Sequence, residues 1–93
     1  MRWSWYVYVI ECGDGLYYTG LTWNLQNRLE QHRSGSGSRF TKRHRFKALK
    51  YAEEFDDFYD AWKRERQIKD FSRKKKEALW CSTEFSLRSN KND

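Results

Sequence analysis

Two apolar segments on either side of the tripeptide Gly13-Asp14-Gly15 constrain the fold more than any other part of the sequence. The first, Trp5–Cys12 (WYVYVIEC), carries aromatic and β-branched residues on both of its faces, which is typical of a strand that is covered on both sides. Asp-Gly between apolar runs is a strong signal for a tight turn, so Leu16–Leu21 is expected to return alongside the first segment. The sequence therefore predicts a β-hairpin whose first strand is central in its sheet.

Capping residues and apolar periodicity predict the elements that follow. Asn24 is placed to cap a helix that Gly35 ends. Asp56 or Asp57, and later Ser72, are placed to cap two more helices. The expected elements are a helix over about residues 25–33, a flexible loop over 34–38, a basic loop over 39–45, a strand over 49–55 and helices over about 58–69 and 73–80. The order ββαβαα predicts the α+β class, with a small three-stranded antiparallel sheet flanked by helices.

Length and charge indicate one basic domain. The 93 residues suit a single domain, which we expect over residues 1–82, followed by a polar, flexible tail over residues 83–93. The formal net charge is +6, and 14 of the 19 Lys and Arg residues lie between Arg39 and Lys76, against 7 Asp and Glu in the same window. A regional positive charge favours a polyanionic partner such as DNA or RNA; a charge that only keeps the surface solvated is the competing interpretation.

Apolar runs and cysteines bear on the cellular compartment. No segment approaches the roughly 20 apolar residues of a membrane span, and Trp5–Ile10 is shorter than the core of a signal peptide. Cys12 and Cys81 show neither a C-x-x-C pair nor metal-ligand spacing, so two reduced, buried thiols are expected and a disulfide is left open. We therefore expect a cytoplasmic protein with no membrane partner.

A carboxylate interrupts the apolar stripe of the predicted helix over residues 58–69. At about 100° per residue, Glu65 falls on the same side as Ala61 and Ile68. An unpaired charge on that side would cost several kcal/mol to bury. Two interpretations remain: a structural salt bridge with an arginine, or a carboxylate that binds a metal ion at the border of a cleft.

Four further polar residues are candidates for a shared site. Arg28 and His32 are four residues apart and share one side of the first predicted helix, where Arg28 can brace a phosphate and His32 can relay a proton. Tyr8 and Tyr18 lie on the paired strands of the hairpin, where cross-strand neighbours can meet on one face. Each residue also has a structural interpretation: Arg28 and His32 can lie on a solvated edge of the helix, and Tyr8 and Tyr18 can be core residues.

The basic loop over residues 39–45 is the candidate nucleic-acid contact. Its Lys and Arg side chains suit phosphate groups, and its aromatic ring suits stacking on a base. These residues are Arg39, Phe40, Lys42, Arg43 and Arg45.

The ordered motifs resemble a known family, the GIY-YIG nuclease domain, and in particular its small stand-alone bacterial members. The resemblance rests on Tyr6-Val7-Tyr8 and Tyr18-Thr19-Gly20 on the hairpin, then on Arg28 and His32 in one helix and Glu65 in a later one. It extends from Trp5 to about Trp80. The sequence departs from the family signature at Tyr6, where a glycine is usual, and at Thr19, the middle of the second triplet. Residues 75–80, where many family nucleases carry an asparagine, contain none.

The resemblance implies hydrolysis of phosphodiester bonds with one divalent cation, Mg²⁺ or Mn²⁺. In family terms Glu65 would hold the metal and Arg28 would stabilise charge on the phosphate. Tyr8 would activate or position the attacking water, with Tyr18 and His32 in support.

Two classes of function follow from these observations. The first is a metal-dependent endonuclease that acts on DNA in preference to RNA and recognises a structure rather than a sequence, since phosphate contacts carry no sequence information. The second is a nucleic-acid-binding module without catalysis, or a nuclease subunit that needs a protein partner.

Overall fold

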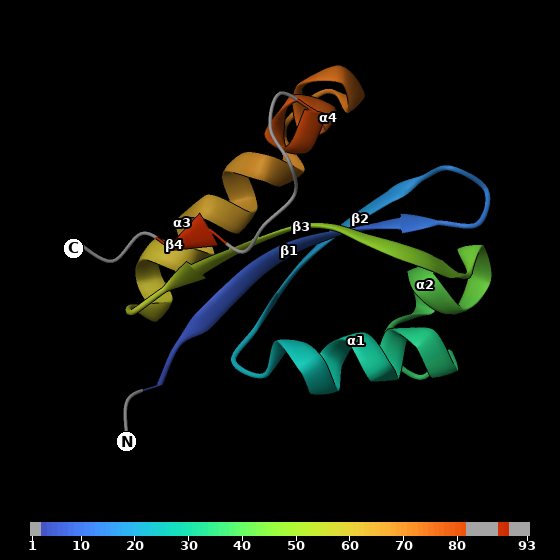
Figure 1. The fold of residues 1–93 in the computed structure, drawn as a ribbon, viewed down its shortest axis with the longest axis horizontal. Coiled ribbons are helices and arrows are strands. Elements are labelled where there is room, and N and C mark those ends of the chain that lie inside the picture. The colour runs from blue at the N-terminus through green and yellow to red at the C-terminus, as the bar shows by residue number, and fades with distance from the viewer. Residues whose placement is uncertain (1–2, 82–87, 90–93) are drawn as a thin grey trace.

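The computed structural model describes residues 3–81 and 88–89, and these form an α+β fold in which helices cover both faces of one sheet (Figure 1). The elements in chain order are β1 (Trp5–Cys12), β2 (Tyr17–Thr22), α1 (Leu25–Ser34), α2 (Arg39–His44), β3 (Phe46–Phe55), α3 (Phe58–Lys69), α4 (Arg73–Cys81) and β4 (Arg88–Ser89). The strand order across the sheet is β2-β1-β3-β4. No helix in residues 3–81 combines the length and the apolar character that a membrane crossing requires.

The predicted hairpin and its central strand are confirmed. β1 pairs antiparallel with β2 on one side and with β3 on the other, and the register places Tyr8 opposite Gly20 and Ala52. At the turn, the Cys12 amide donates to the Leu16 carbonyl over 2.8 Å. Gly15 adopts a left-handed φ of 86°, a conformation that side chains on an L-residue disfavour. The glycine and aspartate signals thus fix the hairpin locally.

The two faces of β1 belong to two separate clusters, which explains why the strand is apolar in both phases. Val7 and Val9 face α3, where they pack with Ala61 and Ile68. The alternate residues Tyr8, Ile10 and Cys12 pack with the partly buried Leu25 and Leu29 of α1. Figure 1 shows α3 and α4 on one side of the sheet and α1 and α2 on the other. Because successive strand residues point to opposite faces, each helix layer takes every second residue of β1.

The predicted helix caps are present at their expected residues. The Asn24 side chain accepts from the Asn27 amide, and Gly35 ends α1 with a φ of 87°. Asp57 caps α3 by accepting from Asp60, and the Ser72 hydroxyl accepts from the Lys75 amide at the start of α4. Local hydrogen-bond chemistry therefore positions the two helices that carry the polar candidates.

Four features of the structure correct the predictions. The expected basic loop over residues 39–45 is the short helix α2, because the Ser38 side chain caps it by accepting from the Thr41 amide. The third strand begins at Phe46 rather than 49, and the two-residue β4 adds a parallel fourth strand beside β3. Both cysteines are free, and Cys12 is buried, but Cys81 is exposed where a buried thiol was expected. The rest of the expected tail, residues 83–87 and 90–93, lies outside the described residues.

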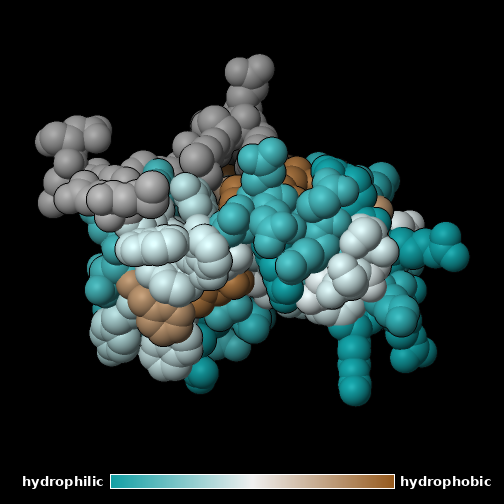
Figure 2. Space-filling view, turned by 90° about the horizontal axis from the view of Figure 1, so that it is seen from below, coloured by the Kyte–Doolittle hydropathy of each residue, from teal (hydrophilic) through white to brown (hydrophobic). Residues whose placement is uncertain are grey.

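The face that carries α1 and α2 is largely hydrophilic. Figure 2 shows hydrophilic residues over most of this side, whereas pale and hydrophobic residues gather at its left end, near the start of β1. Several large apolar side chains are exposed among the described residues, including Trp3, Trp23, Phe58, Tyr59 and Trp62.

Candidate active site

Tyr8 is held in place by the glycine opposite it. Its side chain is fully buried on the α1 side of the sheet. A Cβ added to Gly20 would stand 2.9 Å from Cε1 of the Tyr8 ring and closer still to Cζ and the hydroxyl oxygen. The ring of Tyr8 therefore lies directly over the backbone of β2, and only glycine at position 20 leaves room for it.

His32 of α1 is the hydrogen-bond partner of the Tyr8 hydroxyl. The Tyr8 hydroxyl oxygen and His32 Nε2 are 2.8 Å apart, and His32 Nδ1 lies 2.7 Å from Thr41 Oγ1. The Thr41 hydroxyl in turn lies 2.9 Å from the Ser38 hydroxyl. A Cβ on Gly37 would stand 2.5 Å from His32 Nδ1, so the chain bends tightly around the imidazole. These contacts form a chain of hydrogen bonds from β1 through α1 to α2, which we name the Tyr8–His32–Thr41 chain.

Burial sets the protonation states along this chain. Desolvation raises the pKa of Tyr8 to about 12, although the hydrogen bond and positive charge of Arg28 work in the opposite direction. Desolvation also lowers the pKa of His32 to about 4, with the Arg28 charge as a further cause. At neutral pH the chain therefore contains a phenol and a neutral imidazole. A neutral imidazole has one donor nitrogen and one acceptor nitrogen, so the hydrogen bonds run in one direction along the chain.

Arg28 lies next to both tyrosines. Burial alone would lower the pKa of its guanidinium, but its interactions with the hydroxyl groups of Tyr8 and Tyr18 raise it overall. One guanidinium nitrogen also donates to Gln31 Oε1 over 2.9 Å, which restrains the side chain along α1. The positive charge of Arg28 is therefore held beside the Tyr8 hydroxyl.

Tyr18 completes the aromatic side of the site. Its ring centroid lies 5.2 Å from that of His32 and 6.4 Å from that of Tyr8. Its other neighbour is Phe40 of α2, at 5.6 Å. The structure thus brings the two hairpin tyrosines and the two polar residues of α1 into one cluster.

Glu65 approaches the cluster from α3. Its side chain is only 15% exposed, and Lys69 Nζ lies 3.4 Å from Glu65 Oε2. Its negative charge is among the causes that raise the pKa of Tyr8, so the carboxylate acts electrostatically on the cluster. The predicted salt bridge is present, but its partner is Lys69 and not an arginine.

A single carboxylate is a suitable first ligand for a hard divalent cation. Mg²⁺ in enzymes is usually bound through one or two carboxylates, with water and substrate phosphates completing an octahedron. The described residues hold no group of three or more His, Cys, Asp and Glu side chains that could enclose a metal. Glu65 therefore fits a metal that is shared with a phosphate substrate, and not a metal enclosed by protein alone.

The solvent reaches this region through a depression of about 400 Å³ beside Arg28. Its lining includes Trp5, Leu21, Trp23, Asn24 and Gln31. Tyr8 and His32 do not line it and are almost completely buried. Arg28 is consequently the member of the cluster that a phosphate in this depression would meet.

The predicted nucleic-acid residues divide between the surface and the core. Arg39, Lys42, Arg43 and Arg45 are exposed, as phosphate contacts require. Phe40 is only half-buried, but its ring packs against the rings of Tyr18 and His44, at 5.6 and 4.4 Å. It is part of the cluster around Tyr8 and Ile10, so its ring supports Tyr18. Because part of the Phe40 side chain stays exposed, its stacking on a base stays a prediction.

Thr41 is the site residue that sequence reasoning missed. It is buried, although it lies within a strongly basic segment. The signal in the sequence is Ser38, which caps α2 by accepting from the Thr41 amide, since the residue three positions after a serine cap is directed back toward it. The same short helix thus presents cations outward and one hydroxyl inward to His32.

Helix α4 is anchored to the hairpin through Arg73 and Glu77. Glu77 accepts a hydrogen bond from the Tyr17 hydroxyl over 2.6 Å and pairs with Arg73 at 3.3 Å. Arg73 also donates to the Gly15 carbonyl over 2.6 Å and stacks over the Tyr17 ring. These contacts fix α4 to the hairpin turn.

The fold and this cluster together define a GIY-YIG domain. The family model described as the GIY-YIG catalytic domain matches residues 4–78. The chain therefore belongs to the GIY-YIG family, a nuclease family whose members generally use a divalent metal and act on nucleic acid.

Within the family, the chain is similar to the UPF0213 proteins. It is 45% identical to a UPF0213 protein of Halobacterium salinarum over 75 residues, which cover 81% of this chain and 97% of that protein. It is 44% identical to a UPF0213 protein of Staphylococcus saprophyticus over 71 residues, covering 76% of this chain and 87% of the relative. The solution NMR structure of a UPF0213 protein from Bacillus halodurans has a TM-score of 0.53 at 39% identity, over 82% of this chain and 81% of that one. These similarities confirm the family and the fold.

Proposed function

We propose that this protein is a metal-dependent endonuclease that hydrolyses phosphodiester bonds in DNA. The observation that carries the proposal is the convergence of Arg28 with the Tyr8–His32–Thr41 chain, within electrostatic range of Glu65. An α+β domain without a catalytic or nucleic-acid role would have to combine a buried imidazole, a buried phenol and a neighbouring guanidinium in one cluster by coincidence. Family membership supports the same reaction.

In this proposal the substrate phosphate lies in the depression beside Arg28. The guanidinium donates two parallel hydrogen bonds to phosphate oxygens and stabilises the charge that develops in the transition state. Glu65, whose carboxylate pairs with Lys69 in this structure, would hold Mg²⁺ or Mn²⁺, and the ion would supply polarisation of the phosphate and stabilisation of the leaving oxygen.

The Tyr8–His32–Thr41 chain receives the proton of the attacking water. Tyr8 with a pKa of about 12 is a phenol at neutral pH and is no base by itself. When His32 Nδ1 carries the ring proton and donates to Thr41, Nε2 accepts from the Tyr8 hydroxyl. As water loses a proton to the Tyr8 oxygen, the phenolic proton moves to Nε2; the hydroxide then forms a bond to phosphorus while the bond from phosphorus to the leaving oxygen breaks. Tyr18 keeps the Tyr8 and His32 rings in place.

Recognition in this proposal depends on the backbone of the substrate. The exposed Arg39, Lys42, Arg43 and Arg45 of the α2 region contact phosphates beyond the scissile bond. Phosphate contacts position a nucleic acid but carry no sequence information. We therefore propose that the enzyme selects DNA by structure.

The proposal is tested with a panel of labelled branched, flapped, single-stranded and duplex DNAs, and matching RNAs, incubated with Mg²⁺, Mn²⁺ or EDTA. We expect metal-dependent products from at least one DNA with the wild type, and none with Glu65→Gln or Arg28→Ala. Glu30→Gln is a matched control, since Glu30 is an exposed carboxylate in an ion pair with Arg33 on α1. Undiminished cleavage by Glu65→Gln would show that the metal role is assigned to the wrong residue.

The alternative is a binding module, or a nuclease subunit that needs a protein partner. The complete burial of Tyr8 favours it, because the hydroxyl has no open path to water in this conformation. It predicts salt-sensitive nucleic-acid binding that EDTA does not change, with no products from any substrate in the panel.

A further inference from the structure

Two indole rings stand together at the surface, near the proposed phosphate site. Trp3 precedes β1 and is 59% exposed, and Trp23 lies between β2 and α1 and is 51% exposed. Their ring centroids are 5.1 Å apart with an interplanar angle of 81°. Exposed apolar groups that gather in one place mark interaction sites more often than single exposed residues do.

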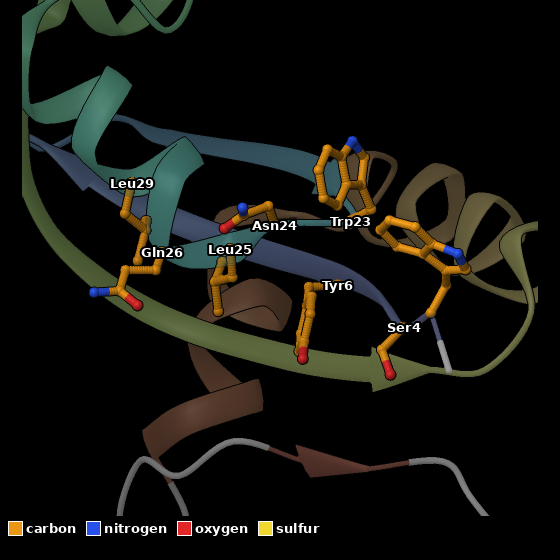
Figure 3. Close-up of a pocket in the computed structure, with 8 residues that line it drawn as sticks. Ser4, Tyr6, Trp23, Asn24, Leu25, Gln26 and Leu29 are labelled. Atoms are coloured by element: carbon orange, nitrogen blue, oxygen red, sulfur yellow. The ribbon is translucent and has the colours of Figure 1, made fainter. Parts of the chain in front are cut away.

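These rings form one end of a groove of about 570 Å³. Figure 3 shows Trp23 toward one end of the groove, the Gln26 amide toward the other end, and Tyr6 and Leu25 between them. The floor is thus apolar and aromatic, and an exposed amide with both donor and acceptor capacity stands at the rim. The aromatic groove, as we name it, combines a stacking surface with a hydrogen-bonding group for the edge of a planar ring.

The aromatic groove adjoins the depression beside Arg28. Trp23 and Asn24 line both of them. A nucleic-acid strand with one phosphate at Arg28 therefore has a neighbouring nucleotide within reach of the indole rings. A net charge of +6 favours a polyanion as the occupant over an uncharged apolar peptide.

We propose that the aromatic groove binds an unpaired nucleobase next to the phosphate held by Arg28. The substrate class is then a nucleic acid with single-stranded nucleotides beside the cleaved bond, a specificity that rests on the proposed function. Every base has a face that stacks on an aromatic ring, so the groove accepts any sequence. A base inside a duplex has both faces covered by its neighbours, so an intact duplex cannot use the groove.

The test compares the binding of a labelled single-stranded DNA and of the same DNA as a duplex, by fluorescence anisotropy in EDTA, where no cleavage occurs. We expect Trp23→Ala to weaken single-strand binding roughly tenfold and to leave duplex binding unchanged, since stacking contributes on this scale per base. Trp23→Phe keeps a stacking surface and should retain most of the affinity.

Tyr59→Ala is the matched control, because Tyr59 lies on α3 and is 59% exposed, as Trp3 is. It should change neither affinity. Trp3→Ala provides an independent variant at the same end of the groove, with an expected loss of the same kind if circular dichroism shows Trp23→Ala to be unfolded.

The outcomes separate this inference from the proposed function. If the wild type binds or cleaves DNA but Trp23→Ala and Trp3→Ala weaken single-strand and duplex binding equally, or not at all, the groove assignment is overturned and the nuclease proposal stands. If the wild type neither binds nor cleaves any nucleic acid, both are overturned. If sedimentation finds a dimer that Trp23→Ala dissociates while DNA affinity is unchanged, the groove belongs to a second copy of the chain.

Discussion

Acidification from pH 8 to pH 5 should destabilise this protein through one buried side chain, His32. The imidazole is 1% exposed, and both of its nitrogens are engaged in the Tyr8–His32–Thr41 chain. Burial, with the nearby Arg28 charge, lowers its pKa from 6.5 to about 4. The folded protein therefore resists protonation at a pH at which the unfolded chain already takes up a proton.

Linkage between protonation and folding gives the direction and the size of the change in the free energy of unfolding. Because the folded pKa is below the unfolded pKa, the contribution of His32 to stability is fully present above about pH 6.5 and is lost as the pH falls toward 4. A shift from 6.5 to about 4 corresponds to roughly 3 kcal/mol in total. At pH 5 the unfolded histidine is almost fully protonated and the folded one is mostly neutral, so about 2 kcal/mol is lost relative to pH 8.

Urea unfolding at pH 8, 6.5 and 5, followed by tryptophan fluorescence and far-ultraviolet circular dichroism, measures this loss. With a slope of about 1 kcal/mol per molar urea for so small a chain, the midpoint should fall by roughly 2 M between pH 8 and pH 5. His32→Gln should be less stable than the wild type at pH 8, but its stability should fall only a little further between pH 8 and pH 5. His44→Gln is the matched control, since His44 is the other of the two histidines and pairs with Asp14 at the surface.

The reasoning is refuted if His32→Gln loses as much stability between pH 8 and pH 5 as the wild type does. If His44→Gln abolishes the loss of stability between pH 8 and pH 5, the responsible group lies at the hairpin turn instead.

Three further substitutions test the packing around the site. Gly20→Ala places a methyl group where the Tyr8 ring lies and should lower the free energy of unfolding by about 1–3 kcal/mol in thermal or urea unfolding; unchanged stability would mean that the ring does not cross β2. Thr41→Val leaves a nitrogen of His32 without its partner and should lower the free energy of unfolding by about 1–3 kcal/mol, with slower DNA cleavage and unchanged DNA affinity. Thr41→Ser keeps the hydroxyl and should restore the stability and the cleavage rate. Thr19→Val removes a buried hydroxyl that has no hydrogen-bond partner within the described residues and should raise stability by about 1 kcal/mol; a loss of similar size would indicate that a bound water satisfies the hydroxyl.

Most of the fold was predictable because its signals are local. The Asp-Gly turn and the caps at Asn24, Asp57 and Ser72 act within a few residues of themselves, and each appears where the sequence places it. The parallel pairing of the two-residue β4 was not predictable, since its partner β3 is far away in sequence and two residues carry no periodicity. The helix over residues 39–44 was not predicted, because its many charged residues favour a solvated loop and only the Ser38 cap indicates a helix.

The candidate site was predictable in its membership more than in its chemistry. Alternation along β1 and the spacing of Arg28 and His32 indicate which side chains share a face. Thr41 was not among them, because its contact with His32 depends on how α2 folds back against α1. Glu65 was among the predicted residues, but its ion-pair partner Lys69 was not, because that contact depends on where the two side chains lie in the folded protein.

The sequence by itself determined the hairpin, three of the four described helices and the residue types available to a phosphodiester site. Only the tertiary structure decided that Tyr8 lies across Gly20, that His32 is enclosed between Tyr8 and Thr41, and that two indoles line one groove. The physical reason is that turns and caps depend on neighbours along the chain. Burial, and with it the pKa of a phenol or an imidazole, depends on which surfaces the packed elements remove from water.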